Sequence, residues 1–351
     1  GMQLIYIVLS CNLFLNTNGS CVEQIDCGSQ KAAKILSAQQ FSCVDCAVFV
    51  AGDNGNHQIG NQIPNPTIDQ FTNVSNLCFE VAFLDVLTSQ FKIGHDVWMA
   101  GNGSYVDRNP VVLDFHHYDV DIQLSGFSQF NTIFQSKITY GQVMTGGYSY
   151  TDSDLKYDYK NLGREDSQEV QPVLTGFLFG QEIKQIGGTL TTTFIVTSHE
   201  VFSTPNKYLV ENNWWTQVSK YWGKVKIPSV TYIVKAIFAK YNLILVDQNL
   251  EYYISGYNLY GQVCNNANGQ YSDFVSVGRL SHISVHEKTS IMINFDSTVQ
   301  FCGYMLNNTV QFSTKQHLKM PAMTKLIDIV ATINGILALI DTPQRELWYF
   351  G

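Results

Sequence analysis

The sequence predicts a mainly β protein with minor α content, built from two or more β-barrel- or sandwich-like domains. Asp, Glu, Lys and Arg make up only 14% of the 351 residues, whereas hydrophobic residues make up 45% and aromatic residues 13%. Short stretches rich in β-branched and aromatic residues recur along the chain, as in strands. Clusters of Gly, Asn and Pro separate these stretches, as in hairpins and loops. A helix–strand element at 229–248 is the expected exception.

The scarcity of charge also indicates assembly. A typical soluble domain carries about 25% charged residues, and these charges keep the surface of a monomer hydrated. We therefore expect this chain to bury part of its surface against copies of itself and against other assembly proteins. The formal net charge of −8 argues against nucleic-acid recognition, because phosphates repel an acidic protein. No apolar run reaches the roughly 18 to 20 residues that a membrane-spanning helix needs.

The first predicted domain, residues 1–150, is β-rich and contains six of the eight cysteines. Strands are expected at Gln3–Ser10, Phe79–Leu87 and Phe91–Met99. The pair Cys43 and Cys46 has metal or redox spacing, but no second pair completes a zinc site. Buried thiols are the favoured interpretation, with zinc as the alternative; an extracellular location would instead favour disulfides.

The densest polar group follows in the same domain, within Val111–Leu124. Side chains two residues apart on a strand point to the same side. Asp114 with His116, or His117 with Asp119, could therefore hold a divalent metal. The favoured alternative is a strand with two polar faces at an edge or a subunit contact. No cofactor is predicted.

The interval 146–172 is the most polar and charged, which predicts a boundary before a second β-rich domain at 151–351. Thr189–Thr197 is expected to be a strand. Arg279–Val285 and Ser290–Phe295 are expected to form a hairpin. Lys325–Ile333 is compatible with a helix or with one strand of a hairpin. No internal repeat of solenoid or propeller period is apparent.

Helical periodicity is clearest at 229–241. Ser229 can cap a helix, and Asn242 can end it in the left-handed conformation. Leu243–Val246 then has the composition of a buried strand. Between the two caps, apolar residues recur at helical spacing: Val230, Ile233, Val234, Ile237, Phe238 and Tyr241.

Three of the five tryptophans lie close together in the sequence, at Trp214, Trp215 and Trp222. Aromatic faces beside the amides of Asn212 and Asn213 suit a glycan or a protein contact. A core patch under the predicted helix explains the same residues equally well.

The predicted helix–strand segment Ser229–Val246 resembles a recurring piece of tailed-bacteriophage baseplate-hub proteins, in which a short helix ends near a "KY-N/G-L" turn and feeds a strand. Here the turn reads Lys240-Tyr241-Asn242-Leu243. The resemblance implies a structural virion component of a phage tail or baseplate, a ring-forming oligomer without a catalytic centre. Its expected location is the virion tail.

Two alternatives from other classes remain open. One is a secreted or cell-surface adhesin that binds glycans through Trp214, Trp215 and Trp222. The other is a metal-dependent enzyme that uses Asp114, His116, His117 and Asp119. No GxSxG, HExxH, GxGxxG or Walker motif is present, and we expect the protein not to be an enzyme.

Overall fold

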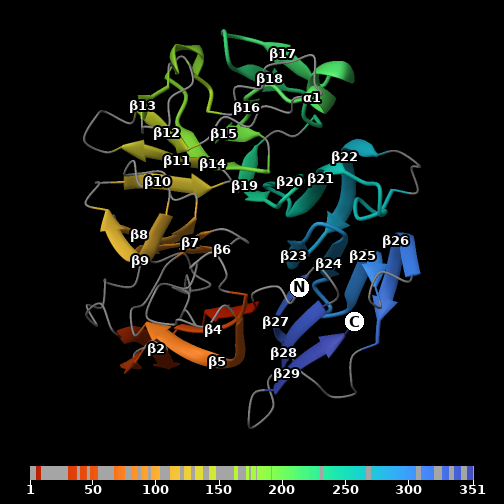
Figure 1. Ribbon diagram of the computed structural model, residues 1–351. Helices are drawn as coiled ribbons and strands as arrows, with labels where there is room; N and C mark the ends of the chain where they lie inside the picture. The colour runs from red at the N-terminus through yellow and green to blue at the C-terminus, as the bar shows by residue number, and fades with distance from the viewer. Residues whose placement is uncertain are drawn as a thin grey trace. The chain divides into compact units, whose positions relative to one another are not determined.

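A computed structural model represents the chain (Figure 1). It describes residues 5–8, 31–37, 40–45, 48–53, 67–75, 81–84, 88–93, 96–102, 111–118, 122–127, 131–136, 142–147, 162–164, 171–173, 175–178, 180–190, 192–229, 232–265, 270–305, 310–319, 326–331, 336–340 and 346–350. The chain forms two compact units, one of residues 1–123 with 136–141 and one of residues 124–135 with 142–351. The domain boundary expected between residues 150 and 151 stays a prediction.

The first unit consists, in its described part, of antiparallel strands. They form the sheets β1-β4-β5, β2-β3 and β6-β7-β8-β9. The predicted strand at Gln3–Ser10 is confirmed by β1, whereas the expected single strand Phe91–Met99 covers the end of β7 and the start of β8. The strands are β1 (Ile5–Val8), β2 (Lys31–Ser37), β3 (Gln40–Asp45), β4 (Val48–Asp53), β5 (Thr67–Ser75), β6 (Val81–Leu84), β7 (Thr88–Ile93), β8 (Asp96–Asn102) and β9 (Val111–Tyr118).

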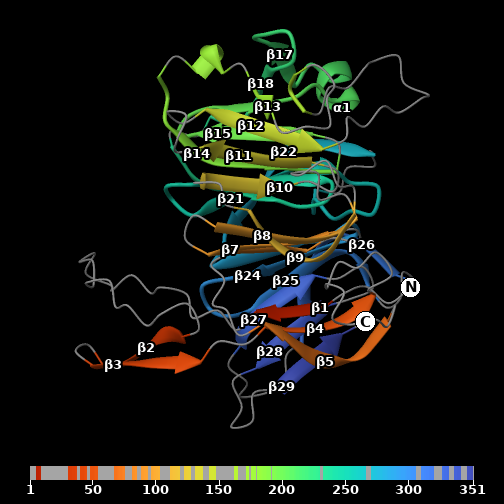
Figure 2. The ribbon, with the colours of Figure 1, turned by 60° about the vertical axis from the view of Figure 1, so that its left-hand side comes forward.

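The second unit contains a series of antiparallel sheets, each made from strands that follow one another in the sequence (Figures 1 and 2). The first sheet is β10 (Ile122–Phe127), β11 (Asn131–Ser136), β12 (Val143–Gly147) and β13 (Gln171–Pro172). The next, in the order β14-β15-β16-β18-β17, is β14 (Ile183–Gly188), β15 (Thr193–Thr197), β16 (Val201–Ser203), β17 (Trp215–Gln217) and β18 (Gly223–Val225). A short 3₁₀ helix, η1 (Gly176–Leu178), precedes these strands in the sequence, and a short α-helix, α1 (Lys207–Glu211), lies between β16 and β17.

Three further sheets follow toward the C-terminus. One is β19 (Ile233–Phe238), β20 (Asn242–Asp247), β21 (Glu251–Tyr257) and β22 (Tyr271–Arg279). Another is β23 (His282–Val285), β24 (Thr289–Ile293), β25 (Val299–Met305) and β26 (Val310–Leu318). The last is β27 (Leu326–Ala331), β28 (Ile336–Ile340) and β29 (Glu346–Phe350). The hairpin alternative for Lys325–Ile333 is confirmed by β27 and β28, and the expected hairpin near 279–295 by β23 and β24.

The helix predicted at 229–241 is wrong, because β19 occupies Ile233–Phe238 and pairs with β20. The register of this pair shifts between Ile233 and Lys235. A bulge adds one residue to a strand, so Ile233 and Ala236, three apart, both face the same core. Val234 between them is 46% exposed. Of the residues expected on one helical face, Ile233 and Phe238 face this core, whereas Ile237 packs against another. The β-branched residues favour the strand.

The sheets of the second unit are buried on both faces where they pack on their neighbours. All six residues of β20 are buried. Leu243 and Leu245 face a core shared with β15, β16 and β18, whereas Ile244 and Val246 face a core shared with β23, β24 and β25. A third core joins β24 and β25 to β27 and β28. A strand buried on both faces carries no polar face.

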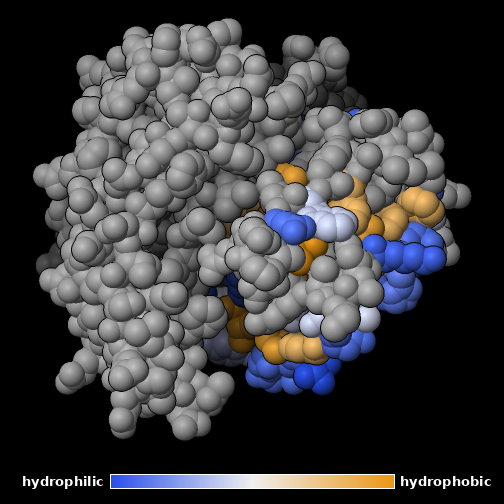
Figure 3. Space-filling model, turned by 90° about the horizontal axis from the view of Figure 1, so that it is seen from below, coloured by the Kyte–Doolittle hydropathy of each residue, from blue (hydrophilic) through white to orange (hydrophobic). Residues whose placement is uncertain are grey.

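This double burial accounts, within one chain, for part of the low charge that the sequence analysis attributed to subunit contacts. The predicted homo-oligomer stays a prediction. On the side of the molecule seen from below, the coloured residues show hydrophobic and hydrophilic side chains lying next to one another (Figure 3). Over the residues that the structure describes, no helix is both long and apolar enough to cross a membrane.

Candidate functional site

The three clustered tryptophans occupy different environments. Trp222 is 1% exposed, and its indole N–H donates to the carbonyl of Gly163 at 3.0 Å. The ring of Phe177 lies 5.8 Å from it, between centroids. Gly163 has φ +69°, and a Cβ there would overlap the indole. Trp222 is therefore a core side chain.

Trp215 and Trp214 contact other parts of the chain. The indole N–H of Trp215 donates to the carbonyl of Ser203 at 3.2 Å, and its ring covers Gly223. Trp214 lines a cavity. In the described part of the chain, its indole N–H is the one of the three without a hydrogen-bond acceptor. The binding role predicted for the group stays a prediction, and the geometry favours Trp214 for it.

For the predicted metal ligands, the structure describes the backbone of Asp114, His116 and His117 within β9. His116 and His117 pair through the backbone with Met99 and Trp98 of β8. The side chains of Asp114, His116 and His117, and all of Asp119, lie outside the described residues. Where side chains are described, no group of three or more His, Cys, Asp and Glu could hold a metal ion. The metal site stays a prediction.

A cluster of five tyrosines, hereafter the tyrosine cluster, lies where β19–β22 and β23–β26 turn from one strand to the next. Tyr257 is central, with Tyr241 and Tyr271 each at 5.3 Å and Tyr260 at 5.7 Å between ring centroids. Tyr304 of β25 lies 5.0 Å from Tyr260. All five side chains are half-buried. The cluster therefore connects two neighbouring sheets through one continuous set of ring contacts.

A buried amide and a glycine position the central ring. Asn242 is 1% exposed, and its Nδ2 donates to the carbonyls of Ser255 at 3.2 Å and Tyr257 at 2.9 Å. Gly256 has φ +116°, and a Cβ there would overlap the Tyr241 carbonyl oxygen. The Tyr257 amide donates to that same oxygen at 3.1 Å. The close approach allowed by the glycine fixes Tyr257 beside Tyr241.

The loop after β21 presents Leu259 and Tyr260. The Oδ1 atom of Asn258 accepts from the Val263 amide at 2.9 Å, and the Gly261 amide donates to the Asn258 carbonyl at 3.0 Å. Gly261 has φ +78°, a conformation that favours glycine. Leu259 at the tip of this turn is 50% exposed. The local hydrogen bonds thus hold an exposed leucine beside the tyrosine cluster.

The same loop is anchored to the next sheet. Gln262 is buried, and its Nε2 donates to the Glu287 carbonyl at 3.0 Å. The Ser290 hydroxyl donates to the Gln262 carbonyl at 2.6 Å. A disulfide joins Cys264 to Cys302 of β25, with 5.5 Å between their Cα atoms. This covalent link ties the loop to the β23–β26 sheet.

Two lysines border the cluster. Lys240 lies 5.4 Å from the centre of the Tyr241 ring, and its Nζ lies 3.2 Å from Oε2 of Glu287. Lys288 lies 5.3 Å from the centre of the Tyr260 ring. Within the described residues Lys288 has no carboxylate partner. Its ammonium group is therefore available to a ligand.

Titration of the site follows its burial. Desolvation, together with Tyr260, raises the pKa of Tyr257 to about 12, so its hydroxyl stays protonated at neutral pH. His286 follows β23, next to Glu287. Burial lowers the pKa of His286 to about 4, against a smaller opposing effect of Glu287, so this imidazole is neutral at physiological pH. The site therefore offers hydroxyl donors, aromatic faces and the Lys288 ammonium.

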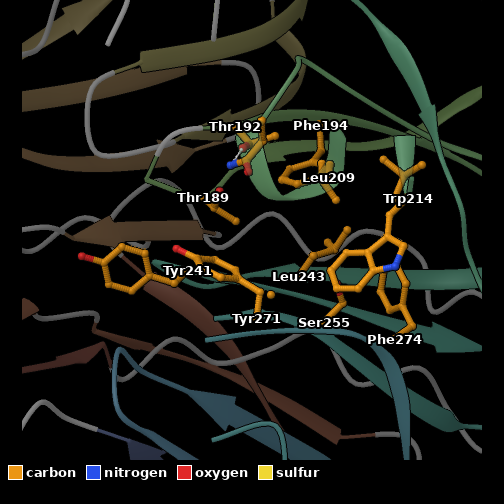
Figure 4. Close-up of a pocket in the computed structure, with 13 residues that line it drawn as sticks. Thr189, Thr192, Phe194, Leu209, Trp214, Tyr241, Leu243, Ser255, Tyr271 and Phe274 are labelled. Atoms are coloured by element: carbon orange, nitrogen blue, oxygen red, sulfur yellow. Dashed lines mark hydrogen bonds between the residues drawn. The ribbon is translucent and has the colours of Figure 1, made fainter. Parts of the chain in front are cut away.

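A cavity adjoins the cluster between the β14–β18 and β19–β22 sheets (Figure 4). Its volume is about 50 Å³. Tyr241 and Tyr271 belong to both the cluster and the cavity lining. In Figure 4, Trp214 lies at one side of the cavity, and Thr189 and Tyr241 lie at the other. The two features are therefore continuous.

The tyrosine cluster is not evident from the sequence. Its members are spread singly over more than sixty residues, and only the sheet register brings them together. A usable signal was the position of tyrosines at strand ends, since Tyr257 ends β21 and Tyr271 begins β22.

No family model matches the chain, and no curated protein matches it. Solved structures do. Prp20p from Saccharomyces cerevisiae has a TM-score of 0.62 at 11% identity, over 83% of this chain and 77% of that one. Human WBSCR16 has a TM-score of 0.63 at 12% identity, over 86% of this chain and 89% of that one. A structure of Kap60 bound to yeast RCC1 (Prp20) has a TM-score of 0.51 at 14% identity, and the match covers 75% of this chain and 64% of that one.

These likenesses concern the fold. The mainly β prediction with very little helix is confirmed, and the neighbours are β-propeller proteins, a more specific architecture than barrel- or sandwich-like domains. Propeller blades are four-stranded antiparallel sheets of consecutive strands, as in β19–β22 and β23–β26. The neighbours are not phage-tail proteins, and the predicted helix is absent, so the baseplate-hub assignment is overturned. The chain is similar in fold to these β-propeller proteins.

Proposed function

We propose that this protein is a protein-interaction module that binds a partner chain through the tyrosine cluster and Leu259. The observation that carries the proposal is the continuous set of ring contacts from Tyr271 through Tyr257 to Tyr304, beside an exposed leucine. No catalytic role is proposed.

The composition of the site supports this function. Tyrosine is enriched at the centres of protein interfaces, where it supplies a large apolar face and one hydroxyl. The ring contacts and the buried Asn242 hold these faces in place before a partner arrives. Little side-chain freedom is then lost on binding.

The charges near the cluster suggest the chemistry of the partner. Lys288 holds an ammonium group over Tyr260 without a carboxylate partner in the described residues. A partner that brings a carboxylate beside an apolar group satisfies both the lysine and Leu259. Interactions of this kind set orientation and association rate more than affinity.

The structural neighbours agree with a binding role. Prp20p is described with its binding to Gsp1p and histones, and yeast RCC1 is described in a complex with Kap60. In those cases the fold binds proteins. The identity of the present partner does not follow from them.

The test is a selection of random linear peptides displayed against the folded protein. Peptides that bind wild type are measured again on Tyr260→Ala and Lys288→Ala by titration calorimetry. Phe295→Ser is the matched control, because Phe295 is 57% exposed in the turn at the opposite end of β24. The proposal predicts that the first two variants weaken binding and that the control does not. Peptides that bind Tyr260→Ala as tightly as wild type would contradict it.

A further inference from the structure

We infer that the cavity beside the tyrosine cluster receives one aliphatic side chain of the partner, with the Trp214 indole N–H donating to the partner's backbone. This inference rests on the proposed function and names a recognition element of that same site.

The lining of the cavity selects an apolar occupant. Phe194 and Val225 line it from one sheet, and Leu243 and Phe274 line it from the next. These residues are the continuation of the core shared by the two sheets. Leu209 of α1 also lines the cavity. An apolar group that enters therefore completes a core instead of meeting water.

The size of the cavity favours an aliphatic group over an aromatic one. Its volume of about 50 Å³ is well below the roughly 150 Å³ of an apolar cavity that binds a benzene ring. The side chains of valine, leucine and isoleucine therefore suit it better than a phenyl or indole ring does.

Trp214 supplies the polar contact. Trp215 and Trp222 donate their indole N–H groups to backbone carbonyls of this chain. Among the described residues, the corresponding group of Trp214 has no acceptor. Indole N–H groups near interfaces find a partner when they are buried. A backbone carbonyl beside the inserted side chain provides one.

Continuity with the proposed binding surface identifies the source of the side chain. Tyr241 and Tyr271 contribute to both features. A chain that lies across the tyrosine cluster therefore reaches the cavity without crossing another element. The occupant is a residue of the bound partner, not a free small molecule.

The experiment uses the peptides selected against the folded wild-type protein. Ser255→Leu fills the cavity, because Ser255 is a buried lining residue whose replacement adds carbon atoms there. Ser255→Ala is the matched control, and thermal unfolding shows whether each variant is folded. We expect Ser255→Leu to weaken binding about tenfold or more, the effect of a lost methylene contact or greater. Ser255→Ala should bind as wild type does.

Three outcomes are distinguishable. Loss of binding in Ser255→Leu and in Tyr260→Ala, together with loss when one Val, Leu or Ile of the peptide becomes Ala, supports the inference. Loss in Tyr260→Ala alone overturns the cavity inference and leaves the proposed function intact. Loss in neither variant overturns the proposed function. If Ser255→Leu does not fold, Trp214→Phe replaces it, and unchanged affinity in that variant overturns the role of the indole N–H.

Discussion

The side-chain nitrogen Nδ2 of Asn242 donates a hydrogen bond to the backbone carbonyl of Tyr257 at 2.9 Å and a second one to the backbone carbonyl of Ser255. One buried side chain therefore holds the end of β21 against the start of β20. It acts where a bulge interrupts the β21–β22 register between Ile254 and Gly256.

Replacing this amide should destabilise the fold. In Asn242→Ala, two carbonyl groups lose their donor in a site that is 1% exposed. Buried groups left without a partner cost about 1 to 3 kcal/mol each. Urea unfolding should show a loss of that order, and Asn249→Ala, an exposed turn position, should show little. Equal midpoints for the two variants would contradict the structural role of Asn242.

Gly256 should tolerate no side chain. Its φ of +116° is unfavourable for other residues, and a Cβ would meet the Tyr241 carbonyl. We expect Gly256→Ala to lower the free energy of unfolding by about 1 to 3 kcal/mol. Gly176→Ala is the control, because a Cβ there meets no atom within 4 Å. Thermal unfolding of both variants tests the difference, and a Gly256→Ala protein as stable as wild type would refute the expectation.

Reduction of the Cys264–Cys302 disulfide should destabilise the protein. The bond links residues 38 apart in the sequence. The chain-entropy estimate for a loop of this length is about 3 to 4 kcal/mol. Unfolding of wild type with and without reductant measures the loss. A Cys264→Ala/Cys302→Ala double variant should already lack this stability, and if it matched the oxidised wild type the bond would be irrelevant to folding.

Stability should fall as the pH drops from about 6.5 to about 4. The pKa of His286 is lowered from 6.5 to about 4 by burial, opposed by Glu287 and reinforced by Lys240 and Lys288. Between these two values the unfolded chain binds more protons at this residue, so acidification favours unfolding. The contribution is fully present above pH 6.5 and is lost toward pH 4.

His286→Gln isolates this contribution from that of other titrating groups. Its free energy of unfolding should depend less steeply on pH than that of wild type over the same range. Differential scanning calorimetry at several pH values measures both slopes. Parallel curves would show that His286 does not titrate as the structure indicates.

The high β content could be predicted from composition, whereas the strand β19 could not be distinguished from a helix. Ile233, Ile237 and Phe238 recur at helical spacing, but the segment is the bulged strand β19. Ile233 and Phe238 face one core of the second unit, and Ile237 faces another. Periodicity does not separate the two cases. The β-branched Ile233, Val234 and Ile237 were the better indicators in this segment.

The repeated architecture also had an overlooked sequence signal. An aromatic residue followed by Gly-Gln occurs at Tyr140–Gln142, Phe179–Gln181 and Tyr260–Gln262. The intervals are about 40 residues and twice that, a period typical of propeller blades. So short a motif does not by itself establish a repeat, and the expectation of no internal repeat stays a prediction. Short motifs of three residues are easily lost among 351.

The candidate site was much less predictable than the fold. Trp214, Trp215 and Trp222 cannot be told apart by residue type. Only the hydrogen bonds of their indole N–H groups distinguish Trp215 and Trp222 from Trp214, which lines the cavity. Tyr241 and Tyr304 are 63 positions apart in the sequence. They belong to one cluster because strands pair within each sheet and side chains of the two neighbouring sheets are in contact. Side-chain chemistry alone does not encode that proximity.

The double burial of β20 has a consequence for how the protein comes apart. Leu243 and Leu245 belong to one core, and Ile244 and Val246 belong to the next. Opening either core exposes half of this strand, so the two cores are energetically coupled through a single strand. The backbone of β20 pairs with β19 and β21, and both of its faces are covered, so its amide protons should be among the slowest of the unit to exchange with solvent. Cooperativity in the second unit thus passes from sheet to sheet through strands that have no solvent side.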